Sequence, residues 1–417
     1  MHKVLGSFAI AAVAAIAISG CSPNAGTDPS SGETVTLQYA IWDMNQEAAM
    51  QRIADTFSQE NPDVDVQIQL IPYGDYFVKL QTSIAGGDAP DVFWMNGPNI
   101  ALYASEGVLA PLGEQDVDTS MYPPGLVELY THGGTLYGAP KDLDTIGLWY
   151  NKELFDAAGV DYPQDGWTWD DMRQAAEALT NPDEGVFGIA AAQLAQENYY
   201  NSICQAGGRV ISPDGKVAGY DSPEALAGIT FWTDFIAQGW SPTAEQMVET
   251  TARDLFLSGK VAMYQTGSWS AGAFADNPDV AKIIDVAPLP TGPRGNQSVI
   301  HGLANVASAH SENLDLAKQF AVFASGEQAA TIQAADGAVI PAYRGSHQAW
   351  VDAAPHFNLQ TFIAAIDTAM PYPASKNTSA WTKHEEHILT QVWAGKLDPE
   401  TGLKQLDEKM QAELDRE

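Results

Sequence analysis

Three residues that could bind a ligand stand at the ends of predicted β-strands. Trp42 and Asp43 come just after the strand-like run 35–40, and Asn96 follows directly on the apolar run 91–95. A tryptophan ring can stack on a flat apolar face of a ligand, and carboxylate or amide groups can hydrogen-bond to its hydroxyl groups. Because ligands gather at strand ends in α/β sheets, these residues predict a binding site.

Three other patterns resemble catalytic or phosphate-binding motifs, but each departs from its motif in spacing or in residue type. His384 and His387 are three residues apart, whereas the helical zinc-protease signature has its histidines four apart. In residues 268–272 (SWSAG), Ser stands where a hydrolase elbow has its first Gly. The glycines of 208–216 do not fit a phosphate-binding loop. We therefore predict no catalytic residue, no metal ligand and no cofactor, and we expect 384–387 on a solvated helix surface.

The elements that must position these residues alternate between strand and helix near the start of the chain. Apolar residues recur at helical spacing in two segments and alternate or run together in three others. The expected strands are 35–40, 64–71 and 91–95, and the expected helices are 47–59 and 76–85. This alternation is typical of parallel α/β layers.

The rest of the chain is richer in helix. Between residues 153 and 281 helices dominate, and Asp214-Gly215 has the composition of a hairpin turn. Residues 261–264 and 283–287 are predicted strands, and 381–417 is predicted to be helical with a break near Asp398-Pro399.

Size and charge narrow the possible functions. The chain has 417 residues, of which 45% are hydrophobic, so it can form two or three domains with sizeable cores. Its formal net charge is −33, which would repel a phosphate backbone and disfavours nucleic acid as a partner. The same charge disfavours long-range capture of anionic substrates, although a local arginine could override it.

The N-terminus has the pattern of an export signal. An apolar run over 4–18, too short to span a bilayer comfortably, ends in Ile18-Ser19-Gly20-Cys21. This resembles the lipobox of bacterial lipoproteins, which implies a signal peptide at 1–20, a lipid on the Cys21 sulfur and a tether outside the cytoplasmic membrane. An ordinary secretory signal is the alternative. The polar stretch 21–33 is expected to be a flexible linker, and Cys204 then has no partner for an intrachain disulfide.

Five sequence blocks behind this signal occur in a characteristic order. They are GGDAPDVFWMN (86–96), YGAPKDLDTIGLWYNKELFDAAGV (137–160), GWTWDD (166–171), FLSGKVAMYQTGSW (256–269) and APLPTGPRG (287–295). Together they resemble the extracellular solute-binding proteins of carbohydrate ABC importers, the maltose-binding-like family 1. The resemblance runs from about residue 35 to near the C-terminus, and the block 137–160 is its most specific part.

The resemblance implies an α/β fold of the two-lobed periplasmic-binding-protein type (type II). Each lobe would be a mixed sheet flanked by helices, and hinge segments would cross between the lobes near 142–145, near 301–302 and near 343. The implied N-terminal lobe is 34–143 plus 302–343, and the C-terminal lobe is 144–301 plus 344–417. A ligand would sit in the cleft, and the lobes would close over it.

The resemblance also implies which residues contact the ligand. Trp269 resembles the stacking platform of the second lobe, Asp142 and Asp144 precede the first crossing, and Arg344 resembles a family arginine that reaches into the cleft. The implied substrate-binding residues are Trp42, Asp43, Asn96, Asp142, Asp144, Trp232, Trp269, His301, Gly302 and Arg344. For the tryptophans the alternative is interior packing, which is favoured for Trp232 by its helical setting. For the polar residues it is a turn, a backbone cap or a surface charge.

The implied function is that of a lipid-anchored, extracytoplasmic receptor. It would be a monomer that captures a mono- or oligosaccharide, the latter being expected, and delivers it unaltered to ABC permease subunits in the membrane. Two alternatives stay open. The same receptor role could serve a non-carbohydrate solute such as a glycerophosphate ester, or a carboxylate pair could make the chain a surface glycoside-active enzyme.

Overall fold

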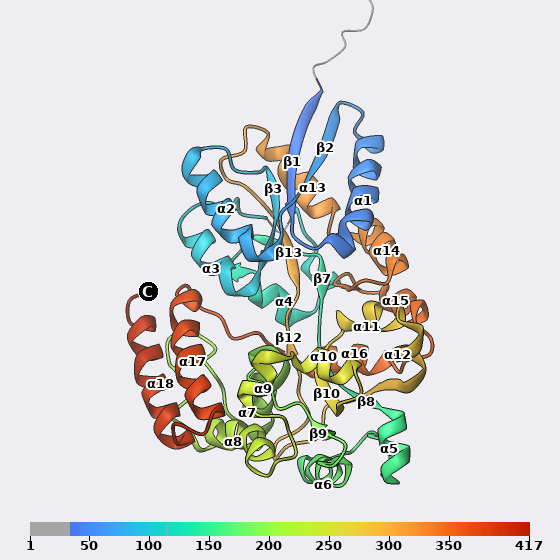
Figure 1. Ribbon diagram of the computed structural model, residues 1–417. Coiled ribbons are helices and arrows are strands. Elements are labelled where there is room, and N and C mark those ends of the chain that lie inside the picture. Colours follow the sequence, from blue (N-terminus) through green and yellow to red (C-terminus); the bar gives the residue numbers. More distant parts are fainter. Residues whose placement is uncertain (1–33, 114) are drawn as a thin grey trace, which may run out of the picture.

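The computed structural model describes residues 34–113 and 115–417, which form two α/β lobes joined by crossing segments (Figure 1). The expected signal peptide, the lipid site at Cys21 and the linker 21–33 lie outside the described residues. Within the described part of the chain, no helix combines the length and the apolar character needed to cross a membrane.

The first lobe is built on a five-stranded mixed sheet in the order β2-β1-β3-β13-β6. Strand β1 pairs in parallel with both β2 and β3, whereas β13 is antiparallel to β3 and to β6. Its strands are β1 (Val35–Ile41), β2 (Val64–Leu70), β3 (Val92–Asn96), β6 (Gly138–Pro140) and β13 (Leu303–Ala307). The return of β13 into this sheet, far along the chain, turns a parallel start into a mixed sheet.

Helices cover the first sheet because their apolar faces need burial. In α1, Met50, Ile53 and Phe57 are buried at helical spacing. The helices around this sheet are η1 (Met44–Gln46), α1 (Glu47–Glu60), α2 (Tyr73–Gly86), α3 (Gly97–Ser105), η2 (Thr119–Met121), α4 (Pro124–Leu129), α13 (Leu314–Phe323) and α14 (Glu327–Asp336). The expected strands and helices of residues 35–95 are confirmed, and a small hairpin of β4 (Thr131–His132) and β5 (Thr135–Leu136) follows α4.

The second lobe has a four-stranded sheet in the order β11-β8-β10-β9. Its strands are β8 (Ile146–Asn151), β9 (Phe187–Ile189), β10 (Val261–Gly267) and β11 (Ile284–Ala287). Its helices are α5 (Lys152–Ala158), α6 (Trp169–Leu179), the π-helical turn η3 (Ala195–Tyr199), α7 (Tyr200–Ala206), α8 (Pro223–Ala237), α9 (Ala244–Glu249), α10 (Ala252–Leu257), α11 (Ser270–Ala275), α12 (Pro278–Ile283), α16 (Gln360–Ala365), η4 (Ile366–Thr368), α17 (Thr378–Trp393) and α18 (Pro399–Leu414). The predicted break near Asp398-Pro399 is confirmed, with Asp398 capping α18.

Short paired strands carry the chain between the lobes. They are β7 (Asp142–Leu143), β12 (Val299–Ile300), β14 (Ile340–Pro341) and β15 (Met370–Pro371). Strand β14 is antiparallel to β7, β12 is parallel to β15, and Asp144 forms a bridge with His301. The sequence did not predict the segment β15. Helix α15 (His347–Ala353) packs on α14 of the first lobe, although it falls within the range 344–417 that was predicted for the C-terminal lobe. The exact lobe boundaries stay a prediction.

Two predictions of the sequence need correction. Around Asp214-Gly215 there is a turn held by a bond from Ser212 N to Val217 O (2.8 Å) and an isolated bridge between Ile211 and Ala218, but no strand on either side. The motif 384–387 is not wholly solvated. Glu386 and His387 are exposed on α17, but the Glu385 side chain points inward and the residue is 3% exposed.

Gly302 is required where two crossing segments meet. Its φ is +156°, and a Cβ there would lie 2.2 Å from the carbonyl oxygen of Asp142 and 2.8 Å from Cα of Leu143. We expect Gly302→Ala to lower the free energy of unfolding by about 1–3 kcal/mol, because backbone atoms must move to admit the methyl group. Urea unfolding followed by circular dichroism measures this. Gly86→Ala, with nothing within 4 Å, is the control, and equal stability of the two variants would contradict the prediction.

Glu385 is a carboxyl group buried in the second lobe. Tyr200 Oη donates to its Oε2 at 3.0 Å, and the Tyr220 hydroxyl donates to its Oε1. Burial raises the pKa of Glu385 from an ordinary 4.5 to about 7, although the tyrosine bonds act to lower it. The folded protein therefore holds this proton over a pH range in which the unfolded chain has released it.

This predicts a stability that falls as pH rises between about 4.5 and 7. Glutamine resembles the protonated carboxyl group and does not titrate. We expect the free energy of unfolding of Glu385→Gln, relative to the parent, to rise by about 3 kcal/mol from pH 4.5 to pH 8, since one pKa unit is about 1.36 kcal/mol. Denaturant titrations across this range measure the difference. A difference between the two proteins that is independent of pH would contradict the prediction.

Candidate functional site

The end of β1 brings an aromatic cluster and a carboxylate to the edge of the first lobe. The half-buried Trp42 ring packs against Tyr73, Tyr76 and Trp94, with centroids 5.5, 4.7 and 5.2 Å away. Asp43 caps the following turn by accepting bonds from Asn45 N and from Gln46 Nε2, both at 2.9 Å. Trp42 is therefore partly packed against core aromatic residues and partly exposed at the edge of the lobe.

Asn96 lies beside this cluster, at the last position of β3. Its side-chain nitrogen donates to Tyr73 Oη at 3.4 Å, and its oxygen accepts from Asn99 Nδ2 at 2.7 Å. Asn96 is 5% exposed, so its main contact is with its protein neighbours, and its bond to Tyr73 Oη helps to orient that ring. The strand ends predicted from sequence are thus brought together in one patch of the first lobe.

A polar row runs from this patch across the hinge. The backbone N–H of Gly97 donates to His301 Nε2 at 3.3 Å, which leaves the ring proton on Nδ1, 3.6 Å from the Asp144 carboxylate. Gln196 Nε2 donates to the other oxygen of Asp144 at 2.5 Å. Since Gln196 belongs to the second lobe, Asp144 and His301 connect the two lobes through side-chain contacts.

The row continues into the second lobe at a carboxyl group. Thr266 Oγ1 lies 3.2 Å from Glu197 Oε1, and Gln265 Nε2 donates to the Glu197 carbonyl at 2.5 Å. Burial raises the pKa of Glu197 to about 7, and the charge of Asp144 adds to this. Burial also raises the pKa of Asp144, against the opposing effect of His301. The two carboxyl groups thus share a weakly solvated region between the lobes.

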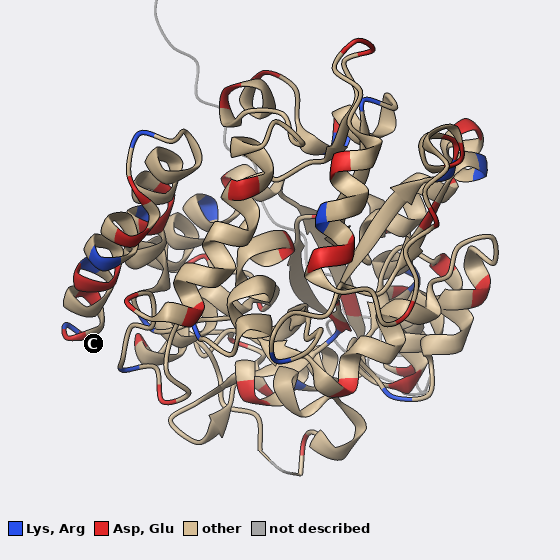
Figure 2. Cartoon of the chain, turned by 90° about the horizontal axis from the view of Figure 1, so that it is seen from below, with Lys and Arg blue, Asp and Glu red and all other residues tan. Residues whose placement is uncertain are grey.

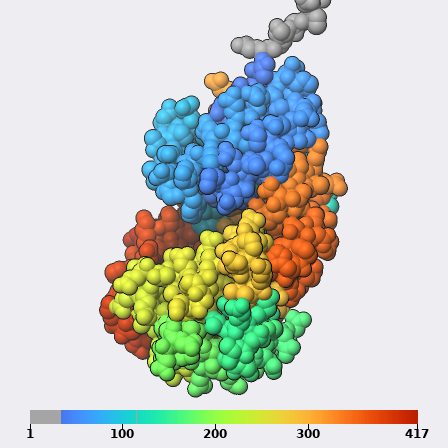
Figure 3. Space-filling view, turned by 45° about the vertical axis from the view of Figure 1, so that its right-hand side comes forward, coloured from blue at the N-terminus to red at the C-terminus, as the bar shows by residue number. Residues whose placement is uncertain are grey.

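Trp269 supplies an exposed aromatic ring at the end of β10. It is 38% exposed, and its six-membered ring covers Gly267, where a Cβ would lie 1.9 Å from the tryptophan Cζ3. Thr266 Oγ1, which lies near Glu197, is also 3.4 Å from the hydroxyl oxygen of Ser270, the residue after Trp269. Figure 3 shows the surface hollowed where the blue first lobe meets the yellow and red second lobe.

Four predicted ligand residues are engaged elsewhere. Trp232 is 1% exposed in the second-lobe core, where its Nε1 donates to Ser202 Oγ at 3.1 Å, so its prediction as a second platform was wrong. Asp142 is 4% exposed, paired with Lys141 and accepting from Leu303 N at 2.7 Å. Gly302 serves the backbone crossing described above. The exposed Arg344 lines a different hollow, with Thr119, Ser120 and Glu128 among its neighbours.

Sequence reasoning missed Tyr73, Gln196 and Glu197, and it gave Tyr372 no role. Tyr372 follows β15, and its ring lies 5.0 Å from His301 and 5.4 Å from Tyr200, centroid to centroid. One sequence signal could have drawn attention to Gln196 and Glu197, because they are polar residues directly after the largely apolar stretch 187–195. In the structure they lie in a π-helical turn, a feature that is frequent at functional sites. Lys376 pairs with Glu106 of the first lobe at 3.6 Å.

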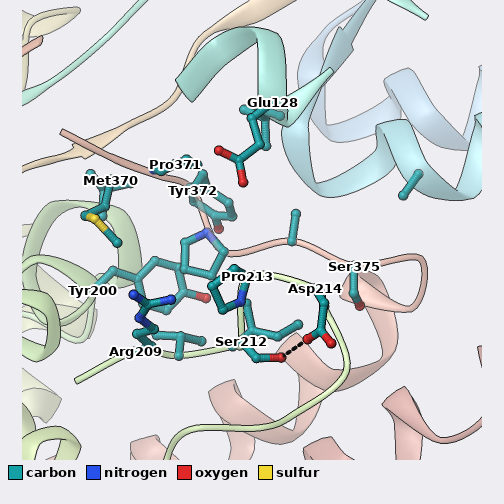
Figure 4. A pocket seen from close by; sticks show the side chains of 18 of the residues that line it. Glu128, Tyr200, Arg209, Ser212, Pro213, Asp214, Met370, Pro371, Tyr372 and Ser375 are labelled. Atoms are coloured by element: carbon teal, nitrogen blue, oxygen red, sulfur yellow. Dashed lines mark hydrogen bonds between the residues drawn. The ribbon is translucent and has the colours of Figure 1, made fainter. Parts of the chain in front are cut away.

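A cavity of about 590 Å³ lies on another side of Tyr372, between α3, α4 and the segments 208–215 and 370–376. Figure 4 shows Glu128 facing Tyr372 and Pro371, with Arg209 and Asp214 below. Trp42, Asn96, Asp144 and Trp269 do not line it. The lining of this cavity is therefore distinct from the polar row, and Tyr372 is a residue that lines the cavity and also contacts His301 of the row.

Among the described residues, no group of three or more His, Cys, Asp or Glu side chains is placed to hold a metal ion. Cys204 is a free, half-buried cysteine whose pKa is raised by burial. The site thus combines an aromatic ring with hydrogen-bonding groups, an arrangement suited to a polar ligand.

Comparisons with known proteins agree with this architecture. Residues 42–331 match the family model described as bacterial extracellular solute-binding protein. The galactooligosaccharide-binding protein of Bacillus subtilis is 24% identical, over 99% of this chain and 98% of its own length. The arabinooligosaccharide-binding protein of the same organism is 25% identical, over 75% of this chain and 74% of its own.

Solved structures give the same result. An ABC substrate-binding protein from Listeria monocytogenes in complex with cycloalternan matches with a TM-score of 0.81 and 29% identity, covering 91% of this chain and 98% of that one. An ABC transporter solute-binding protein from Thermotoga lettingae, bound with alpha-D-tagatose, matches with a TM-score of 0.77 and 25% identity, covering 91% and 100%. The chain belongs to the bacterial extracellular solute-binding protein family.

Proposed function

We propose that this protein captures a carbohydrate, by preference an oligosaccharide, between its lobes and passes it unaltered to an ABC importer. The observation that carries the proposal is the row from Asn96 and His301 through Asp144 to Glu197 and Thr266, together with the exposed ring of Trp269 directly after strand β10. Sugar rings need an aromatic surface for their C–H face and oriented acceptors for their hydroxyl groups. The relatives named above support the choice of ligand class.

The contacts explain how binding would couple to closure. Trp269 and Glu197 belong to the second lobe, Tyr73 and Asn96 to the first, and Asp144 and His301 to the crossing segments. A sugar that touches all three groups binds better when the lobes are close together. It therefore shifts the population toward the closed form by the difference in its affinity for the two forms. The closed form is the one we propose to engage the permease, with the receptor as a monomer.

Calorimetry on residues 34–417 across a panel of neutral mono- and oligosaccharides tests the proposal. We expect saturable binding to at least one saccharide and recovery of the intact sugar by chromatography afterwards. Failure to bind any saccharide would contradict carbohydrate capture. Cleavage of the bound glycan would instead favour a glycoside-active enzyme, and selective binding of a glycerophosphate ester would favour a different solute.

The membrane tether is a separate part of the proposal. The lipobox-like residues ending at Cys21 support a lipid on the Cys21 sulfur. We expect Cys21→Ser to move the exported protein from the membrane fraction to the soluble fraction of the producing cells, as judged by immunoblotting. Cys204→Ser is the matched control, and it should leave the protein in the membrane fraction. Equal membrane retention of the Cys21 and Cys204 variants would contradict the tether.

A further inference from the structure

The row between the lobes carries acidic groups without a cationic partner. Within the described residues, neither Asp43 nor Glu197 forms an ion pair, and Asp144 has only the His301 ring nearby, at 3.6 Å. The Gly97 N–H donates to Nε2 of that ring, so Nδ1 is the nitrogen that faces Asp144. The polar partners of these carboxyl groups are amides and hydroxyls, which carry no charge.

The nearby cationic side chains lie outside the row, and one of them, Arg209, lines the cavity on the other side of Tyr372. Lys141 is fully buried, pairs with Asp142 and donates to Gln46 Oε1 at 2.7 Å. Arg344 lies over η2, its backbone N–H bonded to Met121 O at 2.9 Å. Figure 2 shows the wider setting, in which acidic residues in red are spread over the helices and basic residues in blue are fewer. Nothing in the row can therefore neutralise an anionic ligand.

Burial makes the charge of the ligand matter more here than it would on an open surface. Asp144 and Glu197 are partly shielded from water, and the charge of Asp144 disfavours the ionised form of Glu197. A third negative charge between the lobes would meet two carboxyl groups with little solvent between them. A protonated amine would donate charge-assisted hydrogen bonds to both carboxyl groups and relieve their repulsion.

We propose that this cleft selects its saccharide by charge, and that the group it is best suited to hold is a basic amine on a sugar ring, between Asp144 and Glu197. Neutral sugars bind in the same cleft through hydroxyl groups. Sugars that carry a carboxylate, sulfate or phosphate are excluded. This inference rests on the proposed carbohydrate function and names the class of saccharide within it.

Two matched sets of trisaccharides test the charge selection. The β-1,4 set is cellotriose, the glucosamine trimer and the glucuronate trimer. The α-1,4 set is maltotriose with its 6-amino-6-deoxy and 6-carboxylate derivatives. In the set that binds, we expect the amine to bind at least about tenfold tighter than the neutral trisaccharide. The acid should bind at least about 100-fold more weakly than the neutral trisaccharide, because a like charge costs several kcal/mol in a desolvated contact.

The variant Glu197→Gln tests whether the Glu197 carboxyl group is responsible for the charge selection. It keeps the shape of the side chain and removes its charge, so the ratio of amine to acid affinity should fall at least about tenfold. Glu245→Gln, on the exposed helix α9, is the control for net charge and should leave the ratio unchanged. Denaturant unfolding checks that both variants stay folded, and an affinity ratio is insensitive to a general loss of active protein.

The outcomes separate this inference from the proposed function. Binding of acid and neutral members with similar affinity, or an unchanged ratio in Glu197→Gln, would overturn the charge selection and leave carbohydrate capture standing. Absence of binding by every member of both sets and by the neutral panel would overturn carbohydrate capture, and the charge selection with it.

Discussion

Replacing Trp269 by alanine is expected to weaken saccharide binding by roughly 30-fold to several hundred-fold, or about 2–4 kcal/mol, the range for an aromatic anchor. The ring is 38% exposed and lies over Gly267, so its outer face is free for a sugar. Because part of this side chain stays exposed in the folded state, its removal should lower the free energy of unfolding by less than removal of a fully buried tryptophan. Calorimetric titration and denaturant unfolding of the same preparation measure the two effects.

Two controls separate stacking from a general loss of aromatic surface. Trp269→Phe keeps a smaller ring and should retain part of the affinity. Tyr162→Ala removes another exposed ring of the second lobe, 37% exposed and bonded to Asp156 at 2.6 Å, and should leave affinity unchanged. An unaltered affinity in Trp269→Ala would show that the sugar does not stack on this ring.

Replacing Trp232 by alanine is expected to have the opposite pattern, with a loss of about 3–5 kcal/mol in the free energy of unfolding. The side chain is 1% exposed in α8, packed against Phe231 and Phe235 with centroids 5.3 and 6.0 Å away. Its removal leaves a cavity in a dense core and deprives Ser202 Oγ of a bond from the indole nitrogen. No contact links Trp232 to the polar row.

Chemical denaturation measures this loss, with Trp269→Ala as the matched control because it deletes the same side chain from the surface. At low denaturant, the folded fraction of Trp232→Ala should bind saccharide with nearly the parent affinity. A small loss of stability together with a large loss of affinity would return Trp232 to the ligand site and contradict its place in the core.

These two tryptophans illustrate what the sequence could reveal. Trp232 lies in a stretch, FWTDF, in which apolar residues recur at helical spacing, and this pattern indicates burial. Trp269 follows Gly267 and Ser268 at the end of a strand, a position from which a large ring is easily exposed. Local pattern therefore separated them correctly when weighed alone, whereas the resemblance to a family suggested both.

Elements defined by local pattern were predictable, and contacts across the chain were not. The strands and helices of residues 35–95 follow from alternation, apolar spacing and stop residues. Asp142 and Asp144 have the same chemistry two positions apart, yet only Asp144 faces Gln196, because strand β7 turns Asp142 toward Lys141 and Leu303. Within a regular strand, residues two positions apart share a face, so the different directions of Asp142 and Asp144 arise because β7 ends at Leu143, which the local pattern does not show.

Residues that join the site from distant segments gave the weakest signals. Tyr372 reaches His301 because β15 pairs with β12, a pairing between segments about 70 residues apart. Gln196 and Glu197 depend on a π-helical turn that packs beside β10. Glu385 is buried because Tyr200 and Tyr220 satisfy it, and two partners so far away in sequence are not visible from the helix that carries it.

The most direct test of a sugar site between the lobes is a crystal structure of residues 34–417 with the saccharide that binds best in calorimetry. We expect intact sugar with one ring on Trp269 and hydroxyl or amino groups bonded to Asp144 and Glu197, and lobes closer together than in crystals grown without it. Sugar seated instead in the cavity beside Glu128 and Arg209, sugar cleaved in the crystal, or lobes that keep the same separation with and without ligand would contradict capture between the lobes.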